Sequence, residues 1–138
     1  MTLYVDSSAL TACYVQEDES DAMLEAVRDV DGVTTSRLAL VETGRAIALR
    51  LPATEAGKAR EKMQADVEQM VVIELDRDTC ASALDIAIET GCRTLDALHL
   101  GAMWRLGGED VRLLTRDRRQ ARAAIDVGLP LHPASVGG

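Results

Sequence analysis

The sequence has few of the residues that build several common kinds of site. It contains no phenylalanine, one tryptophan, two tyrosines and two histidines. Its three cysteines, Cys13, Cys80 and Cys92, are widely spaced and form no C-x-x-C pair. This pattern argues against a zinc site and against a disulfide framework. We expect reduced thiols packed among apolar neighbours, and a core of aliphatic side chains.

Long apolar runs are also missing. No stretch approaches the roughly 20 apolar residues that a membrane-spanning helix needs, and the first residues, "MTLYVDSSAL", carry no basic segment of the kind that opens a signal peptide. We therefore expect a soluble cytoplasmic protein with no membrane association.

Positive charge is in deficit. Fifteen Lys and Arg face 23 Asp and Glu, which gives a formal net charge of −8. This balance argues against a protein that coats nucleic acid non-specifically, because such binding depends on clustered basic residues. It does not exclude an enzyme that acts on nucleic acid, since a bound cation offsets the charge of a carboxylate site.

What the chain does have is an alternation of short strands and helices. At 138 residues and 47% hydrophobic it has the size and the apolar content of one domain. Strands are predicted at 2–5, 33–36, 71–75, 111–115 and, less regularly, 129–131. Helices are predicted at 7–15, 16–30, 54–70, 77–90, 94–106 and 118–127, with a further one from about 36 that ends at Pro52. The alternation predicts an α/β domain over 1–132 with a mainly parallel sheet, followed by a flexible tail at 133–138.

Four carboxylates stand out by position. Asp6 and Asp117 directly follow predicted strands, where sites form in open parallel sheets. Either could instead simply cap the helix that follows. Glu42 could be an ordinary exposed or salt-bridged residue, and Asp96 could be an acid favoured by a helix N-terminus.

Glu42 and Asp96 are nevertheless embedded in apolar sequence, "LALVETGRAI" and "TLDALHLGAM". A lone buried carboxylate is costly to desolvate, and several together raise one another's pKa. A divalent cation removes that cost. Oxygen ligands without a Cys or His cluster favour Mg²⁺ or Mn²⁺.

Four segments together resemble a known family. In order they read "LYVDSSAL", "LALVETGRAI", "RTLDALHLGAM" and "LLTRDRRQARAA". Their order and spacing resemble the PIN-domain ribonucleases, in particular the VapC toxins of bacterial toxin–antitoxin pairs, over nearly the whole chain. The resemblance implies a three-layer α/β/α PIN-like fold with a central, mainly parallel, short-stranded sheet.

The resemblance also implies an activity and a site. It implies a Mg²⁺- or Mn²⁺-dependent endoribonuclease acting on single-stranded or loop RNA of tRNA, rRNA or mRNA, which would inhibit translation. The acids of the family match Asp6, Glu42, Asp96 and Asp117, of which Asp6, Asp96 and Asp117 would bind metal. Its small hydroxyl residues match Ser7 and Thr115, which would support carboxylates or waters. Implied partners are a VapB-type antitoxin and a second copy of the chain in a homodimer.

Other polar residues near these segments are ambiguous. Five arginines near Asp117 could form a solvated helix face or a rim that contacts RNA phosphates: Arg112, Arg116, Arg118, Arg119 and Arg122. His99 is expected to be a packed or hydrogen-bonded structural residue, and Trp104 is expected in the core.

Two other classes compete. A phosphotransfer domain also places an Asp after its first strand, but the phosphatase class needs a second Asp where this chain has Ser8. Such domains also need a lysine after a later strand, whereas Lys58 and Lys62 both lie in the charged helix at 54–70. A non-catalytic PIN-fold protein that binds a partner or RNA without cleavage is the second alternative. A binding protein has no evident use for a repulsive carboxylate cluster.

Overall fold

The computed structural model describes residues 1–107 and 110–138. Its strands are β1 (Thr2–Val5), β2 (Gly32–Ser36), β3 (Val71–Ile73) and β4 (Val111–Leu114). Its helices are α1 (Ser7–Ala12), α2 (Ser20–Arg28), α3 (Arg37–Arg50), α4 (Ala53–Val67), α5 (Arg77–Thr90), α6 (Thr94–Trp104) and α7 (Arg118–Asp126). Over these ranges no helix combines the length and the apolar character needed to span a membrane.

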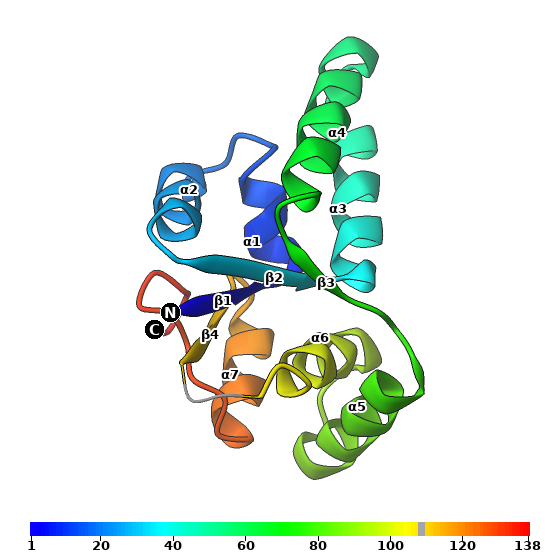
Figure 1. Ribbon diagram of the computed structural model, residues 1–138, viewed down its shortest axis with the longest axis vertical. Coiled ribbons are helices and arrows are strands. Elements are labelled where there is room, and N and C mark those ends of the chain that lie inside the picture. The colour runs from blue at the N-terminus through cyan, green and yellow to red at the C-terminus, as the bar shows by residue number, and fades with distance from the viewer. Residues whose placement is uncertain (108–109) are drawn as a thin grey trace.

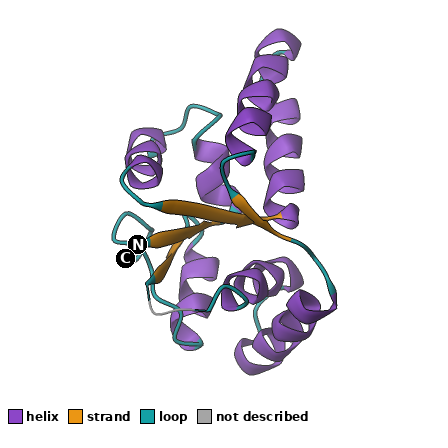
Figure 2. Cartoon of the chain, viewed as in Figure 1, coloured by secondary structure: helices purple, strands orange, loops and turns teal. Residues whose placement is uncertain are grey.

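The four strands form one parallel sheet in the order β3-β2-β1-β4. Helices α1 to α4 lie on one side of the sheet and α5 to α7 on the other, as Figure 1 shows, so the predicted three-layer α/β/α fold with a parallel sheet is confirmed. Figure 2 shows the short strands enclosed between these two helical layers. The chain adds strands in one direction from β1 to β3 and then returns to the other side of β1 with β4. The carboxyl ends of β1 and β4 therefore flank the point where strand order reverses, which is where open sheets bind ligands.

The two larger core clusters follow from the alternation of side chains along β1. Leu3 and Val5 pack with α1 and α2, whereas Tyr4 points to the opposite face and packs with α6 and α7. All three side chains are fully buried. The sheet is thus covered on both faces, as expected for parallel strands.

Helix ends are set by caps that the sequence signals. Ser36 caps α3 by accepting from Ala39 N at 3.2 Å, and Asp76 caps α5 by accepting from Thr79 N at 3.0 Å. Gly91 ends α5 in the left-handed conformation, with φ of 71°. The predicted helix at 77–90 is therefore confirmed at both ends.

Two predictions about local structure are wrong. Trp104 was expected in the core, but it is 52% exposed. The segment 129–131 forms only an isolated bridge between Leu131 and Leu113. The segment 133–138, predicted as a flexible tail, makes hydrogen bonds to the end of β4: Val136 N donates to Thr115 O at 3.0 Å, and the Ser135 hydroxyl donates to Leu113 O at 2.8 Å.

The close contact of α5 and α6 depends on a glycine. A Cβ on Gly101 would lie 2.8 Å from Ala83 N and from Thr79 O, both backbone atoms. We expect Gly101→Ala to lower the free energy of unfolding by about 1–3 kcal/mol, because neither backbone atom can move freely. Gly57→Ala on α4 is the matched control, since its added Cβ meets no described atom within 4 Å, and we expect it to stabilise by about 0.5–1 kcal/mol. Urea denaturation of both variants measures the difference, and equal stabilities would contradict the packing argument.

Candidate functional site

The four predicted acids line one cavity at the carboxyl edge of the sheet. Asp6 follows β1, Glu42 lies on α3, Asp96 lies in the first turn of α6 and Asp117 follows β4. All four line a cavity of about 310 Å³, called here the carboxylate cavity. Four segments that are far apart in the sequence therefore meet where strand order reverses.

Asp6 is the most enclosed of the four. It is 3% exposed, and its Oδ1 accepts from Ala9 N at 3.0 Å and from the Ser8 hydroxyl at 2.6 Å. Its Oδ2 accepts from the Thr115 hydroxyl. Asp6 therefore caps α1, and it also lines the carboxylate cavity. These hydrogen bonds leave one lone pair of Asp6 Oδ2 unused.

The other acids differ in environment. Asp117 caps α7 by accepting from Arg119 N at 2.9 Å and from Gln120 N at 3.4 Å. Asp96 is not engaged as a cap, and the peptide oxygen of Asp96 accepts from Gln120 Nε2 at 3.4 Å. Glu42 is 30% exposed and bonds to His99 Nε2 at 2.7 Å through Oε1.

The pKa values of these acids are pushed apart. Burial raises the pKa of Asp6, against the pull of His99 and its hydroxyl donors. Burial and the nearby charge of Asp117 raise the pKa of Asp96. Burial opposes ionisation of Glu42 as well, but the hydrogen bond and charge interaction with His99 and a hydrogen bond from Ser7 outweigh it, so its pKa lies below the usual range. Two acids of the cavity therefore resist ionisation unless positive charge is supplied.

Both hydroxyl residues that were predicted to support the acids lie at the site, and a third was not predicted. Ser7 lines the carboxylate cavity with Glu42, and Thr115, which is fully buried, donates to Asp6 and accepts from Asp117 N at 3.0 Å. Ser8 was not assigned a role, yet it donates to Asp6 and accepts from Arg116 N at 2.8 Å. The "DSS" triplet directly after a buried strand was the signal for it.

Removal of the Thr115 hydroxyl should therefore be costly. We expect Thr115→Val to lower the free energy of unfolding by about 1–3 kcal/mol, because Asp6 and the Asp117 amide each lose a buried partner. Thr115→Ser keeps the hydroxyl and should retain most of the stability. Guanidinium denaturation of the two variants makes the comparison, and a Val variant as stable as the Ser variant would contradict this network.

The carboxylate cavity has the chemistry of a site for a hydrated divalent cation. Within the described residues, no three His, Cys, Asp or Glu side chains are close enough to hold a metal ion directly between them. Mg²⁺, however, commonly uses one or two carboxylates and keeps several waters. Gln120 lines the cavity, is 1% exposed, and leaves its Oε1 without a partner in the described chain. An unpaired acceptor beside free carboxylate oxygens fits a hydrated cation rather than a closed protein cage.

A second cavity of about 890 Å³ adjoins the first and shares Ser7, Glu42 and Asp117 with it. Its basic lining consists of Arg45, Arg50, Arg116, Arg118 and Arg119, and we call it the arginine groove. Arg50 pairs with Glu17, and Arg116 pairs with both Glu17 and Glu19. In the part of the chain that is described, Arg45, Arg118 and Arg119 make no ion pair.

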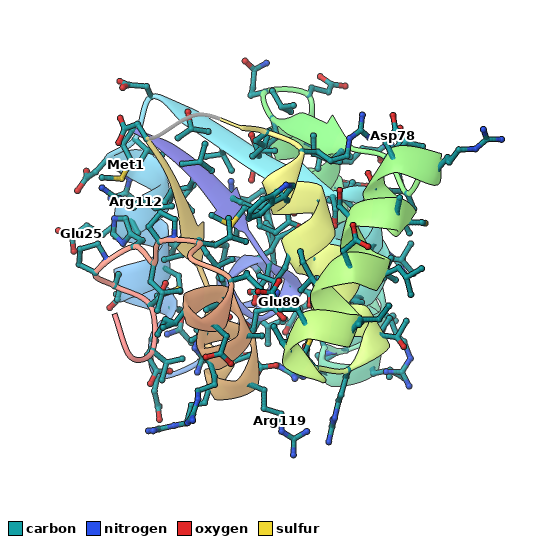
Figure 3. The ribbon with its side chains drawn as sticks, turned by 90° about the horizontal axis from the view of Figure 1, so that it is seen from below. Met1, Glu25, Asp78, Glu89, Arg112 and Arg119 are labelled. Atoms are coloured by element: carbon teal, nitrogen blue, oxygen red, sulfur yellow. The ribbon has the colours of Figure 1, made fainter. Side chains whose placement is uncertain are left out.

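The structure brings most, but not all, of the predicted basic rim to the site. Arg116, Arg118 and Arg119 line the arginine groove, and Arg122 lines a neighbouring cavity that also includes Asp96. Arg112 lies within β4, upstream of the strand end that reaches the site, and its charge acts on His132. Figure 3 shows Arg112 and Arg119 at separate edges of the molecule. The prediction that Arg112 belongs to this rim is therefore not supported.

Comparison with known proteins agrees with this geometry. Residues 3–126 match the model of the PIN domain family. Ribonuclease VapC46 of Mycobacterium tuberculosis is 34% identical over 127 residues, which cover 92% of this chain and 93% of that protein.

Solved structures share the fold. VapC20 of Mycobacterium tuberculosis, described as a sarcin–ricin loop cleaving toxin, has a TM-score of 0.70 at 17% identity, covering 88% of this chain and 94% of its own. VapBC2 of Rickettsia felis, bound to a DNA fragment from its promoter, has a TM-score of 0.70 at 11% identity and covers 99% of both chains. A toxin–antitoxin complex from Klebsiella pneumoniae has a TM-score of 0.66 at 15% identity, covering 99% of this chain and 96% of its own. With the fold, the ordered acids and a relative at this identity in agreement, the chain belongs to the PIN domain family.

Proposed function

We propose that this chain is a divalent-metal-dependent endoribonuclease that hydrolyses phosphodiester bonds in single-stranded or loop RNA. The observation that carries the proposal is the meeting of four carboxylates from β1, α3, α6 and the end of β4 around one cavity. The ribonuclease name of its 34%-identical relative supports the same reading.

Asp6, Asp96 and Asp117 would hold Mg²⁺ or Mn²⁺, directly or through water. When bound, the cation supplies an activated water and neutralises charge on the phosphoryl oxygens. Glu42 serves as a further ligand or as the group that orients or deprotonates the attacking water. Ser8 and Thr115 donate to Asp6, and Ser7 lines the carboxylate cavity with Glu42, so these hydroxyls would orient the carboxylates as supporting residues do at other metal sites.

The arginine groove gives the RNA backbone a place to bind. Arg118 and Arg119 lie beside Asp117, and Arg45 lies one turn along α3 from Glu42. Guanidinium groups that share this groove with Glu42 and Asp117 would contact phosphates on either side of the scissile bond. The charge of the arginine groove is therefore opposite in sign to the net charge of the chain, which is −8.

A protein partner is part of the proposal. Several structural neighbours are toxin–antitoxin complexes, some of them with DNA. We infer that this chain is likewise the toxin of a cytoplasmic pair, forms a homodimer, inhibits translation by cutting RNA, and is neutralised by a VapB-type antitoxin.

Incubation of the purified chain with total cellular RNA tests the function. We expect discrete fragments with Mg²⁺ or Mn²⁺, none with EDTA, and none from Asp96→Asn with any cation. Sequencing the fragment ends would identify the RNA. Absence of cleavage with every cation would overturn the nuclease and leave a PIN-fold protein that binds RNA or a partner without cutting.

A further inference from the structure

Glu42 is not a free carboxylate at the cavity wall, because a buried histidine on another helix holds it. His99 Nε2 on α6 lies 2.7 Å from Glu42 Oε1 on α3. The His99 side chain is 5% exposed, so this contact is shielded from water on the histidine side. His99 was expected to be a packed or hydrogen-bonded structural residue, but its partner could not be foreseen because the two residues are 57 positions apart.

The second nitrogen of His99 also has a partner. The Tyr4 hydroxyl lies 3.1 Å from Nδ1, and the two rings meet edge to face with centroids 6.2 Å apart. Tyr4 is fully buried, and this burial raises the pKa of its phenol well above the usual value. The phenol therefore keeps its proton and can donate it.

The direction of these hydrogen bonds follows from the chemistry of the three groups. The ionised Glu42 carboxylate can only accept, so His99 Nε2 carries the proton that it donates to Glu42. In the neutral ring Nδ1 is then an acceptor, and the Tyr4 hydroxyl donates its proton to it.

The hydrogen-bonded path joins three elements. Tyr4 belongs to β1, His99 to α6, and Glu42 lies on the second turn of α3. Tyr4 and His99 are both less than 5% exposed. This buried path restrains the rotation of the Glu42 side chain in a way that a solvent-facing ion pair could not.

We propose that Tyr4 and His99 form a hydrogen-bonded relay that holds the Glu42 carboxylate in one orientation at the carboxylate cavity. On the proposed nuclease function, on which this inference rests, Tyr4 and His99 are positioning residues of the reaction. The relay fixes one oxygen of Glu42 toward His99 and leaves the other for the attacking water or the cation.

Kinetics of matched variants test the role. We expect Tyr4→Phe and His99→Leu to lower kcat about 10–100-fold, which is the range found for residues that orient catalytic or metal-binding side chains through hydrogen bonds. KM for the RNA should change far less. His99→Gln places an amide N–H near the position of Nε2 and should recover much of kcat. His132→Gln, at the other histidine of the chain, is the control and should leave kcat unchanged. Thermal unfolding without metal confirms that each variant is folded.

Imidazole ¹⁵N NMR of the metal-free wild type tests the relay without any nuclease assay. We expect His99 to carry its proton on Nε2, and the Nδ1 resonance to shift in Tyr4→Phe. A proton on Nδ1, an unchanged kcat in folded Tyr4→Phe, or equal kcat in His99→Gln and His99→Leu would each overturn the proposal. If the wild type cleaves no RNA, the nuclease function fails separately, and the positioning role fails with it, whereas the NMR result still decides whether the hydrogen-bonded path exists.

Discussion

Asp6→Asn is expected to reduce RNA cleavage by at least about 100-fold, more than is typical of residues that only support a ligand. Asparagine keeps the size of the side chain and still caps a helix well, so α1 should begin at the same residue. What the variant loses is the negative charge that would hold a cation at the end of β1. Initial rates on a defined RNA with saturating Mn²⁺ measure the effect.

The control for this variant is Asp85→Asn on the exposed side of α5, which changes the net charge equally and lies outside the carboxylate cavity. It should cleave at the wild-type rate. We also expect metal-free Asp6→Asn to be at least as stable as the wild type, because it removes a buried charge whose pKa is raised in the folded state. Cleavage by Asp6→Asn at the wild-type rate would show that this carboxylate has no part in the reaction.

A divalent cation should stabilise the fold, and should do so more at neutral than at acidic pH. Burial raises the pKa of Asp6, and burial together with Asp117 raises that of Asp96, so the folded state binds protons more tightly than the unfolded state. The metal-free protein therefore loses stability as pH rises above about 4, the ordinary range of carboxyl groups, and through the raised values. Glu42 has the opposite effect at lower pH, because its pKa is lowered in the folded state. Its contribution to the stability of the fold is lost as pH falls below the ordinary carboxyl range.

The expected size of this effect is large. A cation at about 100 times its Kd stabilises by about 2.7 kcal/mol, which corresponds to a rise in Tm on the order of 10 °C for a domain of this size. Thermal unfolding with Mn²⁺ and with EDTA measures the rise in Tm. The comparison is made at about pH 5, close to the ordinary pKa range of carboxyl groups, and at about pH 7.5, well above that range. A Tm shift that is the same at both pH values, or that persists in an Asp6→Asn, Asp96→Asn double variant, would contradict a cation bound by these acids.

The elements that the sequence predicted well are those with local signals. The helix predicted at 77–90 is observed at Arg77–Thr90, with a capping Asp at one end and a glycine at the other. The positions of Asp6 and Asp117 after β1 and β4 follow from strand ends that are themselves visible as short apolar runs. Parallel strands then bring these ends to one edge of the sheet, which is why spacing alone could place them near each other.

The features that were missed depend on contacts between distant elements. Trp104 is a large apolar residue near the end of α6, yet its side of the helix faces outward, which no local pattern indicates. The segment at 133–138 is rich in small residues, but its hydrogen bonds to Leu113 and Thr115 hold it to β4. The relay from Tyr4 through His99 to Glu42 combines three elements and could be found only from their packing.

End-group analysis of the cleaved RNA tests the central claim most directly, because it reports which nucleophile attacked the phosphate. A water activated at the carboxylate cavity breaks the bond by hydrolysis and leaves a monophosphate on one fragment and a hydroxyl on the other, only when Mg²⁺ or Mn²⁺ is present. We predict these ends for the wild type and no cleavage for Asp6→Asn. A 2′,3′-cyclic phosphate that forms equally in EDTA would mean that the RNA's own 2′-hydroxyl attacks, and would contradict a metal-dependent carboxylate site.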